Sequence, residues 1–389
     1  MSQLGGAGGA GGAGGAGGAG GAGGAGGAGG AGGAGGAGGA GGAIIGTLAD
    51  VYANPIMVDA LILGREGIIV PEGSSYAPAL PTHIDAAKEL ERWEPWVRAY
   101  LAIGEMMQGI SFQKSSSGDG FQVSSSVSGS PPTLIAEIGR PDQQTFEKQI
   151  SMVLSWAELR NERATEIIAQ IDPQYAFWSS IVYLHPDRTR RTFELINMVL
   201  QFCVYVEMRF KQALACYRPV EYNAEVQPMI TTPGHGSFPM GHATQTHAVA
   251  YVLKQLLKLD KTAHPAHKWV IDQFDRQAAR IATNRVIAGL HFPVDSMAGR
   301  MLGVALGEYF YGRCTGHQTF MSRTFNSAVI DGQPTLDFNP FSADQKLDEA
   351  PAAGKLYSYS AGTSVTRSDL MEHLWDKAQH EWKGRFGVH

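Results

Sequence analysis

Five side chains that suit anion chemistry fall within three short segments of the chain. They are Lys211, Arg218, His242, Arg285 and His291. Lysine and arginine offer positive charge and N–H donors to the oxygens of a tetrahedral oxyanion. Imidazoles move protons near neutral pH, or bond an electrophilic central atom through a ring nitrogen. The set predicts one oxyanion-binding site that can also do proton-transfer and bond-making chemistry.

The first segment, FKQALACYRP, holds Lys211 and Arg218 at a spacing of seven residues. Seven residues make two helical turns, so both side chains are expected on one face of a helix. Pro219 disfavours helical backbone at the preceding residue and cannot continue the helix. We therefore predict that this helix ends at Arg218.

The second segment places Pro239, Gly241 and His242 just before a periodic apolar stretch. This order predicts that His242 lies near a helix N-terminus. Backbone N–H groups at such a terminus favour bound anions.

The third segment, NRVIAGLHFPVD, predicts a helix that carries Arg285 and stops near Gly289, with a second helix opening around Pro293. Asp295 would lie in the first turn of the second helix, and His291 in the short joint. In an unbroken helix, Arg285 and His291 would point about 120° apart. A break at Gly289 lets them converge.

Together the three segments resemble the vanadium haloperoxidase and acid phosphatase superfamily, also called the type 2 phosphatidic acid phosphatase family. Its pattern is Lys, six residues, Arg-Pro; then Pro-Ser-Gly-His; then Ser-Arg, five residues, His, three residues, Asp. The chain matches every charged and imidazole position over about 85 residues. It departs at Met240 and Asn284, where the pattern has serines. With Met240 in place of serine, one hydrogen bond to an oxygen of the bound anion is lost, which costs about 1.5–3 kcal/mol of binding free energy.

The resemblance implies a role for each matched residue. The groups that would hold the anion oxygens are Lys211, Arg218, Arg285 and the N–H of Gly241. His291 would bond the central atom, as the nucleophile on phosphorus or the single protein ligand to vanadium. His242 would act as general acid and base on the apical oxygen, and Asp295 would fix the tautomer of His291.

Three features favour the haloperoxidase branch, with vanadate as cofactor and hydrogen peroxide and halide as substrates. His235, seven residues before His242, resembles an extra histidine of bromoperoxidases. No stretch reaches the roughly 18 apolar residues of a membrane span, and a long helical region precedes Lys211. A soluble acid phosphatase that cleaves small phosphomonoesters through a phospho-histidine is the alternative. A degenerate oxyanion-binding or scaffold protein is the third, because of Met240.

The composition limits the remaining partners. The net charge is −5 and 44% of residues are hydrophobic, with no basic stripe outside the proposed pocket, which argues against nucleic acid. Cys203, Cys216 and Cys314 are expected to be core thiols. No secretory signal is visible, which predicts a soluble protein of unassigned compartment. The sequence leaves open whether the chain forms a homo-oligomer.

Three regions are expected along the chain. Residues 1–43 hold thirteen Gly-Gly-Ala repeats, interpreted as a linker or as a stand-in for undetermined sequence; residues 44–132 form an N-terminal helical and loop region; residues 133–389 form a helical core with the site.

Helical periodicity is expected near residues 84–108, 143–171, 187–217, 242–259, 267–288, 293–311 and 367–383. Residues 114–132, rich in Ser, Gly and Pro, predict a loop that serves as a lid or subunit contact. Sustained strand alternation is nearly absent, so we predict a mainly α bundle. Gly299, Gly303 and Gly307 predict close packing of one helix face.

Overall fold

The computed structural model of the chain describes residues 55–65, 80–81, 83–116, 118–126, 132–171, 174–316, 319–347 and 354–389. It divides into two units, Ser2–Arg98 and Ala99–His389. The Gly-Gly-Ala tract lies outside the described residues, and the three-region division stays a prediction. Within the first unit, the described elements are α4 (Pro55–Arg65), η1 (Ala87–Arg92) and the start of α5 (Pro95–Met107).

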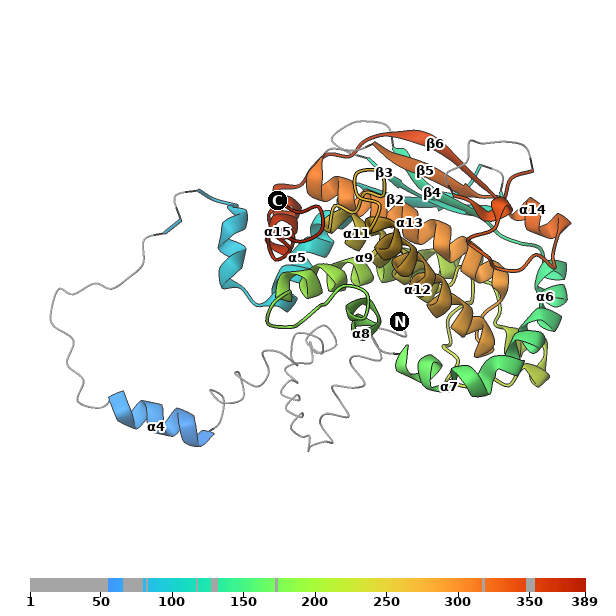
Figure 1. The fold of residues 1–389 in the computed structure, drawn as a ribbon, viewed down its shortest axis with the longest axis horizontal. Helices are drawn as coiled ribbons and strands as arrows, with labels where there is room; N and C mark the ends of the chain where they lie inside the picture. The colour runs from blue at the N-terminus through green and yellow to red at the C-terminus, as the bar shows by residue number, and fades with distance from the viewer. Residues whose placement is uncertain are drawn as a thin grey trace. The chain divides into compact units, whose positions relative to one another are not determined.

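Helices make up most of the second unit, which confirms the mainly α fold class (Figure 1). After α5, the longer helices are α6 (Gln143–Trp156), α7 (Arg160–Ala169), α9 (Arg190–Leu214), α11 (Gly241–Leu256), α12 (His267–Ile287), α13 (Pro293–Thr315) and α15 (Asp369–His380). The shorter ones are η2 (Ala157–Leu159), α8 (Tyr175–Ser179), α10 (Pro219–Tyr222), η3 (Ala224–Val226), α14 (Ser327–Gly332) and η4 (Ala343–Gln345). The predicted helices over 242–259, 267–288 and 293–311 match α11, α12 and α13 closely.

The helix α11 is the centre of the core. It is buried around nearly its whole circumference and packs against α9, α12 and α13. A methyl group added at Gly303 of α13 would overlap the backbone oxygen of Thr244 in α11, and one added at Gly299 would overlap that of Met240, which immediately precedes α11. The predicted close packing of this glycine face is therefore confirmed. Because the axes approach so closely, the N-terminus of α11 is held against the start of α13.

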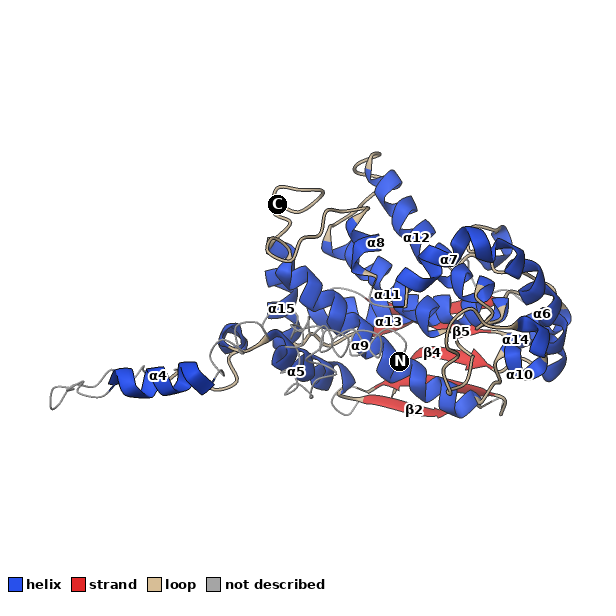
Figure 2. Ribbon diagram, turned by 90° about the horizontal axis from the view of Figure 1, so that it is seen from below, coloured by secondary structure: helices blue, strands red, loops and turns tan. Residues whose placement is uncertain are grey.

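A five-stranded sheet lies beside the helices of this unit, and its extent was not predicted (Figure 2). Its strands run in the order β2 (Ile110–Lys114), β3 (Gly120–Ser125), β4 (Thr133–Gly139), β5 (Thr319–Phe325) and β6 (Tyr357–Ser364). Only β4 and β5 pair in parallel. Helices α9 and α13 contact the sheet.

The predicted loop over residues 114–132 is wrong where β3 runs. This strand is almost entirely buried, and its last serine has a partner inside the fold: Ser125 Oγ lies 2.9 Å from the Tyr309 hydroxyl. Small polar residues usually indicate turns, because their side chains hydrogen-bond nearby backbone. Here α13 supplies a polar partner for the strand, and that contact is not visible in the local sequence.

We expect Gly303→Ala to destabilise the fold. The new methyl group would force α11 and α13 apart, at a cost of about 1–3 kcal/mol in the free energy of unfolding. Urea denaturation followed by circular dichroism measures the change. The matched control is Gly104→Ala, at an exposed helical glycine whose added methyl would have no neighbour within 4 Å. That variant should equal the wild type or gain up to about 1 kcal/mol; equal stability of the two variants would contradict the packing role.

Candidate oxyanion-binding site

The two cations of the first segment do not share a helix face, contrary to the sequence prediction. Helix α9 ends at Leu214, and Ala215 adopts left-handed backbone with φ of 49°. Arg218 is extended and immediately precedes Pro219, which opens α10. The chain therefore turns sharply between Lys211 and Arg218. Proline favours the first position of a helix, because it lacks an N–H that would be unpaired there and its φ is already helical.

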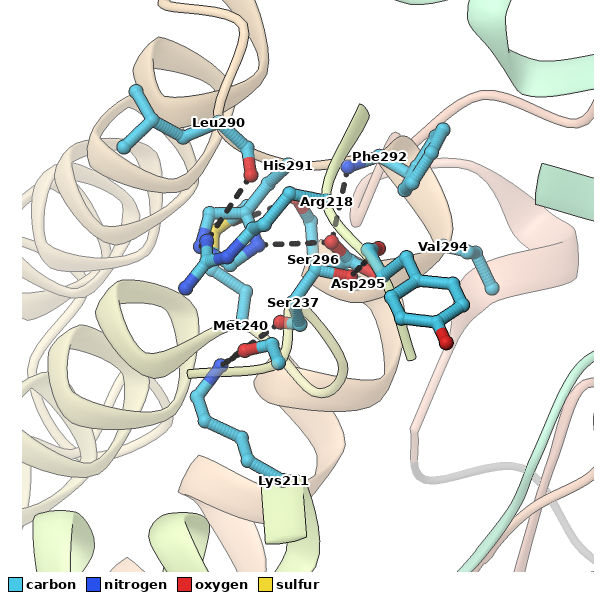
Figure 3. Close-up of polar contacts among 12 residues, drawn as sticks. Lys211, Arg218, Ser237, Met240, Leu290, His291, Phe292, Val294, Asp295 and Ser296 are labelled. Carbon is cyan, nitrogen blue, oxygen red and sulfur yellow. Dashed lines mark hydrogen bonds and ion pairs between the residues drawn. The ribbon is translucent and has the colours of Figure 1, made fainter. Parts of the chain in front are cut away.

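Lys211 is a buried cation held by backbone oxygens. Its Nζ donates to the carbonyl of Ser237 at 2.8 Å and to that of Gly236 at 3.1 Å (Figure 3). Burial, and then the neighbouring Arg218 charge, lower the pKa of Lys211 to about 7. The lysine therefore changes its charge within the neutral pH range.

Arg218 joins the first segment to the third. Its Nη1 donates to the carbonyl of Leu290 at 3.1 Å and lies 2.8 Å from Nε2 of His291. Its Nε donates to the carbonyl of His235 at 3.1 Å. Burial lowers the pKa of Arg218 to about 10, which leaves the guanidinium charged at neutral pH. An arginine can only donate, so Nε2 of His291 is the acceptor in this contact.

The contact between His291 and Asp295 fixes the other ring nitrogen. Nδ1 lies 2.8 Å from Oδ2 of Asp295, which also accepts the backbone N–H of Phe292 at 3.0 Å. Nδ1 therefore carries the proton, and the lone pair of Nε2 points among the cations (Figure 3). Asp295 also caps the N-terminus of α13 by accepting the N–H of Phe292.

The joint between α12 and α13 forms as predicted. Helix α12 ends at Ile287, and Gly289 has a positive φ of 79°. A side chain at Gly289 would also meet the guanidinium of Arg160. Glycine is the residue that adopts this backbone at little cost. The turn brings His291 and Arg218 together.

His242 lies at the N-terminus of α11, as predicted, because that helix begins at Gly241. Its Nε2 lies 3.0 Å from the carbonyl oxygen of Gln170, so Nε2 carries the proton. Burial, and then the charge of Arg285, lower the pKa of His242 well below its usual value. His242 is neutral at neutral pH.

Arg285 retains hydrogen-bonding capacity that no described residue uses. Its Nη2 donates to the carbonyl of Ile167 at 2.7 Å and lies 3.3 Å from Oε1 of Gln170. Nε and Nη1 are buried without a partner among the described residues. Burial lowers the pKa of Arg285 to about 10, so its charge persists at neutral pH. Unpaired buried donors on a charged group are costly, and an anion would satisfy them.

Gly241 is required by a buried carboxylate. A methyl group at Gly241 would lie 2.7 Å from Oε1 of Glu207, an oxygen that accepts from Nε2 of Gln245 at 2.8 Å. Burial raises the pKa of Glu207, and the charge of Lys211 opposes that rise. Sequence reasoning missed this carboxylate. The signal that could have found it is its position four residues before Lys211 on one helix.

Met240 and His235 are the neighbours that distinguish this site. The Met240 side chain is fully buried, and its sulfur lies 3.7 Å from the hydroxyl of Ser296, which donates to it (Figure 3). Nδ1 of His235 lies 3.1 Å from Nη2 of Arg218 and 3.1 Å from the carbonyl oxygen of Gly236. Nε2 of His235 is buried and has no partner among the described residues.

The predicted residues of all three segments therefore meet in one buried region. Lys211, Arg218 and Arg285 supply three cations, and His242 and His291 are neutral imidazoles among them. The unused donors of Arg285 fit an oxyanion such as phosphate or vanadate. Vanadate is a tetrahedral oxyanion like phosphate, so the same donors suit both.

Comparisons with known proteins agree with the superfamily resemblance. A vanadium-dependent bromoperoxidase of Ascophyllum nodosum is 30% identical over a match that covers 27% of this chain and 24% of that protein. The match thus spans about a quarter of the bromoperoxidase. The crystal structure of a transmembrane PAP2 type phosphatidylglycerolphosphate phosphatase from Bacillus subtilis is 18% identical, with a TM-score of 0.25, over 42% of this chain and 93% of that one. No protein-family profile matches. The bromoperoxidase match confirms the resemblance to the vanadium haloperoxidase and acid phosphatase superfamily.

None of the helices in the described residues has the length and apolar character needed to cross a membrane.

We expect anion affinity to fall as the pH rises through about 7, because Lys211 loses its proton there. Sulfate is the suitable probe, since its own charge is constant across this range. Titration calorimetry between pH 6 and 9 should show a fall of up to about tenfold per pH unit above pH 7. Lys211→Arg should flatten this dependence, because arginine stays protonated.

Any slope that survives in Lys211→Arg is assigned to Asp295. Burial raises the pKa of this carboxyl, and its ionisation at higher pH would also repel sulfate. An unchanged slope in both Lys211→Arg and Asp295→Asn would contradict the assignment.

Proposed function

We propose that the chain is a haloperoxidase-like enzyme that oxidises halide with hydrogen peroxide at a vanadate bound to His291. The observation that carries the proposal is the hydrogen-bonding state of His291. Asp295 accepts from Nδ1, so Nε2 carries the lone pair, which faces Arg218, and the charge of Lys211 also acts on this ring. A ring nitrogen in this state can bond an electrophilic central atom, and the cations balance the charge of its oxygens.

The anion oxygens would be held by the side chains of Lys211, Arg218 and Arg285 and by the N–H of Gly241. Nε and Nη1 of Arg285 are available without breaking any contact with a described residue. Bonding through Nε2 of His291 requires Nη1 of Arg218 to move from that nitrogen to an anion oxygen. The N-terminus of α11 adds the favourable end of a helix dipole.

His242 would move the proton in this reaction. When bound, vanadate activates hydrogen peroxide towards halide without a change in the oxidation state of vanadium. Removal of a proton from hydrogen peroxide requires a base, and His242 is neutral because burial and Arg285 lower its pKa. Its Nε2 proton is already donated to the Gln170 carbonyl, so the other ring nitrogen would accept. This arrangement supports a reaction in which the histidine acts first as a base.

His235 would contribute to the halide site. Its Nε2 is buried without a partner among the described residues and would be the donor in the tautomer whose Nδ1 accepts from Arg218. A halide needs N–H donors and nearby positive charge, and both are present here. The similarity to a vanadium-dependent bromoperoxidase points the same way.

Phosphomonoester hydrolysis is the second candidate, because the same lone pair of Nε2 could attack phosphorus. That reaction needs a protonated histidine to release the alcohol. The lowered pKa of His242 disfavours this acid, which is why we place hydrolysis second. A protein that binds the anion but has lost turnover is the third candidate. It is suggested by Met240, which stands where the superfamily pattern has a serine hydroxyl.

We expect the purified chain, supplied with vanadate, hydrogen peroxide and bromide, to brominate an organic reporter. Activity should depend on vanadate and be competed by phosphate. His291→Ala should lower it about a thousandfold or more, because the bond to the central atom is lost. His264→Ala, at an exposed histidine, is the control and should retain activity.

A parallel assay with p-nitrophenyl phosphate in the absence of vanadate separates the two reactions. Hydrolysis that depends on His291, with no bromination at any vanadate concentration, would transfer the assignment to the phosphatase. Vanadate binding with neither activity would favour the degenerate site.

Met240→Ser should tighten vanadate binding by about tenfold to a hundredfold, the effect of one hydrogen bond to a charged group. Met240→Ala is the matched control, since it leaves a similar cavity without a hydroxyl. Titration of each variant with vanadate, followed by ⁵¹V resonance, measures the difference. Equal affinities of the two variants would show that position 240 does not reach the anion.

A further inference from the structure

Gln170 is a buried residue outside the three sequence motifs, and it contacts both His242 and Arg285 of the site. It follows the last residue of α7 and is fully buried. Its backbone carbonyl accepts from Nε2 of His242 at 3.0 Å. Its side-chain Oε1 accepts from Nδ2 of Asn284 at 3.0 Å and lies 3.3 Å from Nη2 of Arg285.

The orientation of the Gln170 amide is fixed by its neighbours. Nε2 lies 2.9 Å from a carboxylate oxygen of Glu166, which can only accept. The amide therefore turns its nitrogen to Glu166 and its oxygen to Asn284 and Arg285. Nη1 of Arg163 lies 3.3 Å from Oδ1 of Asn284, so that amide is oriented as well.

The acceptors that hold Arg285 are all neutral. They are the carbonyl of Ile167 and the amide oxygen of Gln170. The carboxylate of Glu166 is instead paired with Arg280, at 2.8 and 2.9 Å from Nε. Neutral acceptors fix the guanidinium plane without cancelling its charge, whereas a carboxylate in the same place would form an ion pair.

We propose that Gln170 is a positioning residue that holds Arg285 through a neutral acceptor, so that the charge and the free N–H groups of Arg285 remain for the oxyanion. This inference rests on the proposed function only in assuming that the site binds an oxyanion. It holds for halide oxidation and for phosphomonoester hydrolysis alike. Glutamate has nearly the same shape as glutamine. In a Glu166→Gln background, which removes the carboxylate that lies 2.9 Å from the Gln170 amide nitrogen, Gln170→Glu would therefore replace a neutral partner of Arg285 by a charged one with little change in volume. Every variant at position 170 and its reference protein carry Glu166→Gln.

The test is titration calorimetry of the full chain with sulfate at pH 7. We expect Gln170→Glu to weaken sulfate binding by about tenfold or more, the effect of losing a charge-assisted interaction. Gln170→Met removes the acceptor but leaves the charge of Arg285 in place, so it should weaken binding by a smaller factor, about threefold. Gln144→Glu adds the same charge at an exposed position of α6 and should leave binding unchanged.

A double-mutant cycle separates an effect through Arg285 from a general structural one. In an Arg285→Met background, Gln170→Glu should have no further effect on sulfate affinity. Equal losses in Gln170→Glu and Gln170→Met, or a full additional loss in the Arg285→Met background, would overturn the proposal. If Gln170→Glu does not fold, Gln170→Met provides the test. A loss of sulfate affinity as large as that of Arg285→Met would contradict the role of a neutral acceptor.

The same measurements keep this inference distinct from the proposed reaction. Sulfate binding that responds to Gln170→Glu, in a protein without bromination, would overturn the haloperoxidase assignment and support the role of Gln170. A brominating wild type whose sulfate affinity is indifferent to Gln170→Glu would overturn only the inference. Absence of any sulfate binding by the wild type would overturn both.

Discussion

Three cations must be buried together and held in place without losing their charge, and the rest of the site depends on this constraint. Burial of a charge is costly unless polar groups replace water. Carboxylates would meet that cost but would neutralise the pocket. The fold uses backbone carbonyls instead: Lys211 donates to Gly236 and Ser237, Arg218 to His235 and Leu290, and Arg285 to Ile167. A carbonyl dipole accepts a directed hydrogen bond while the net positive charge remains.

Helix ends supply several of these groups, because the last carbonyls and first N–H groups of a helix have no partner within it. Ile167 lies in the last turn of α7, and Leu290 is a buried residue of the joint that follows α12. The N-terminus of α11 faces the same region. The close approach of α11 to the glycines of α13 keeps these ends together, so the packing of the core and the charge of the site are linked.

Two buried carboxyls complete the balance without pairing directly with an arginine. Asp295 accepts from His291 and from the backbone of Phe292, and Glu207 accepts from Gln245. Burial raises the pKa of both. Burial first, and then the neighbouring cations, lower the pKa values of Lys211, His242 and His291, which keeps both imidazoles neutral. A neutral imidazole can bond a central atom or accept a proton, which a charged one cannot. The same electrostatic field thus attracts an anion and sets the protonation that both candidate reactions need.

The sequence by itself determined the local parts of this protein. Gly241, Gly289 and Pro293 act on the backbone of their own neighbourhood, so the starts of α11 and α13 and the joint that holds His291 could be predicted. Pro219 predicted a helix end at Arg218, but α9 ends at Leu214. The tertiary structure decided the rest. Lys211 and Arg218 were expected on one helix face, but left-handed backbone at Ala215 separates them. Gln170 reaches His242 from 72 residues away, and buried Ser125 of β3 finds its partner in Tyr309 of α13. Local patterns specify turns and caps, whereas hydrogen-bond partners far along the chain become visible only when the elements pack.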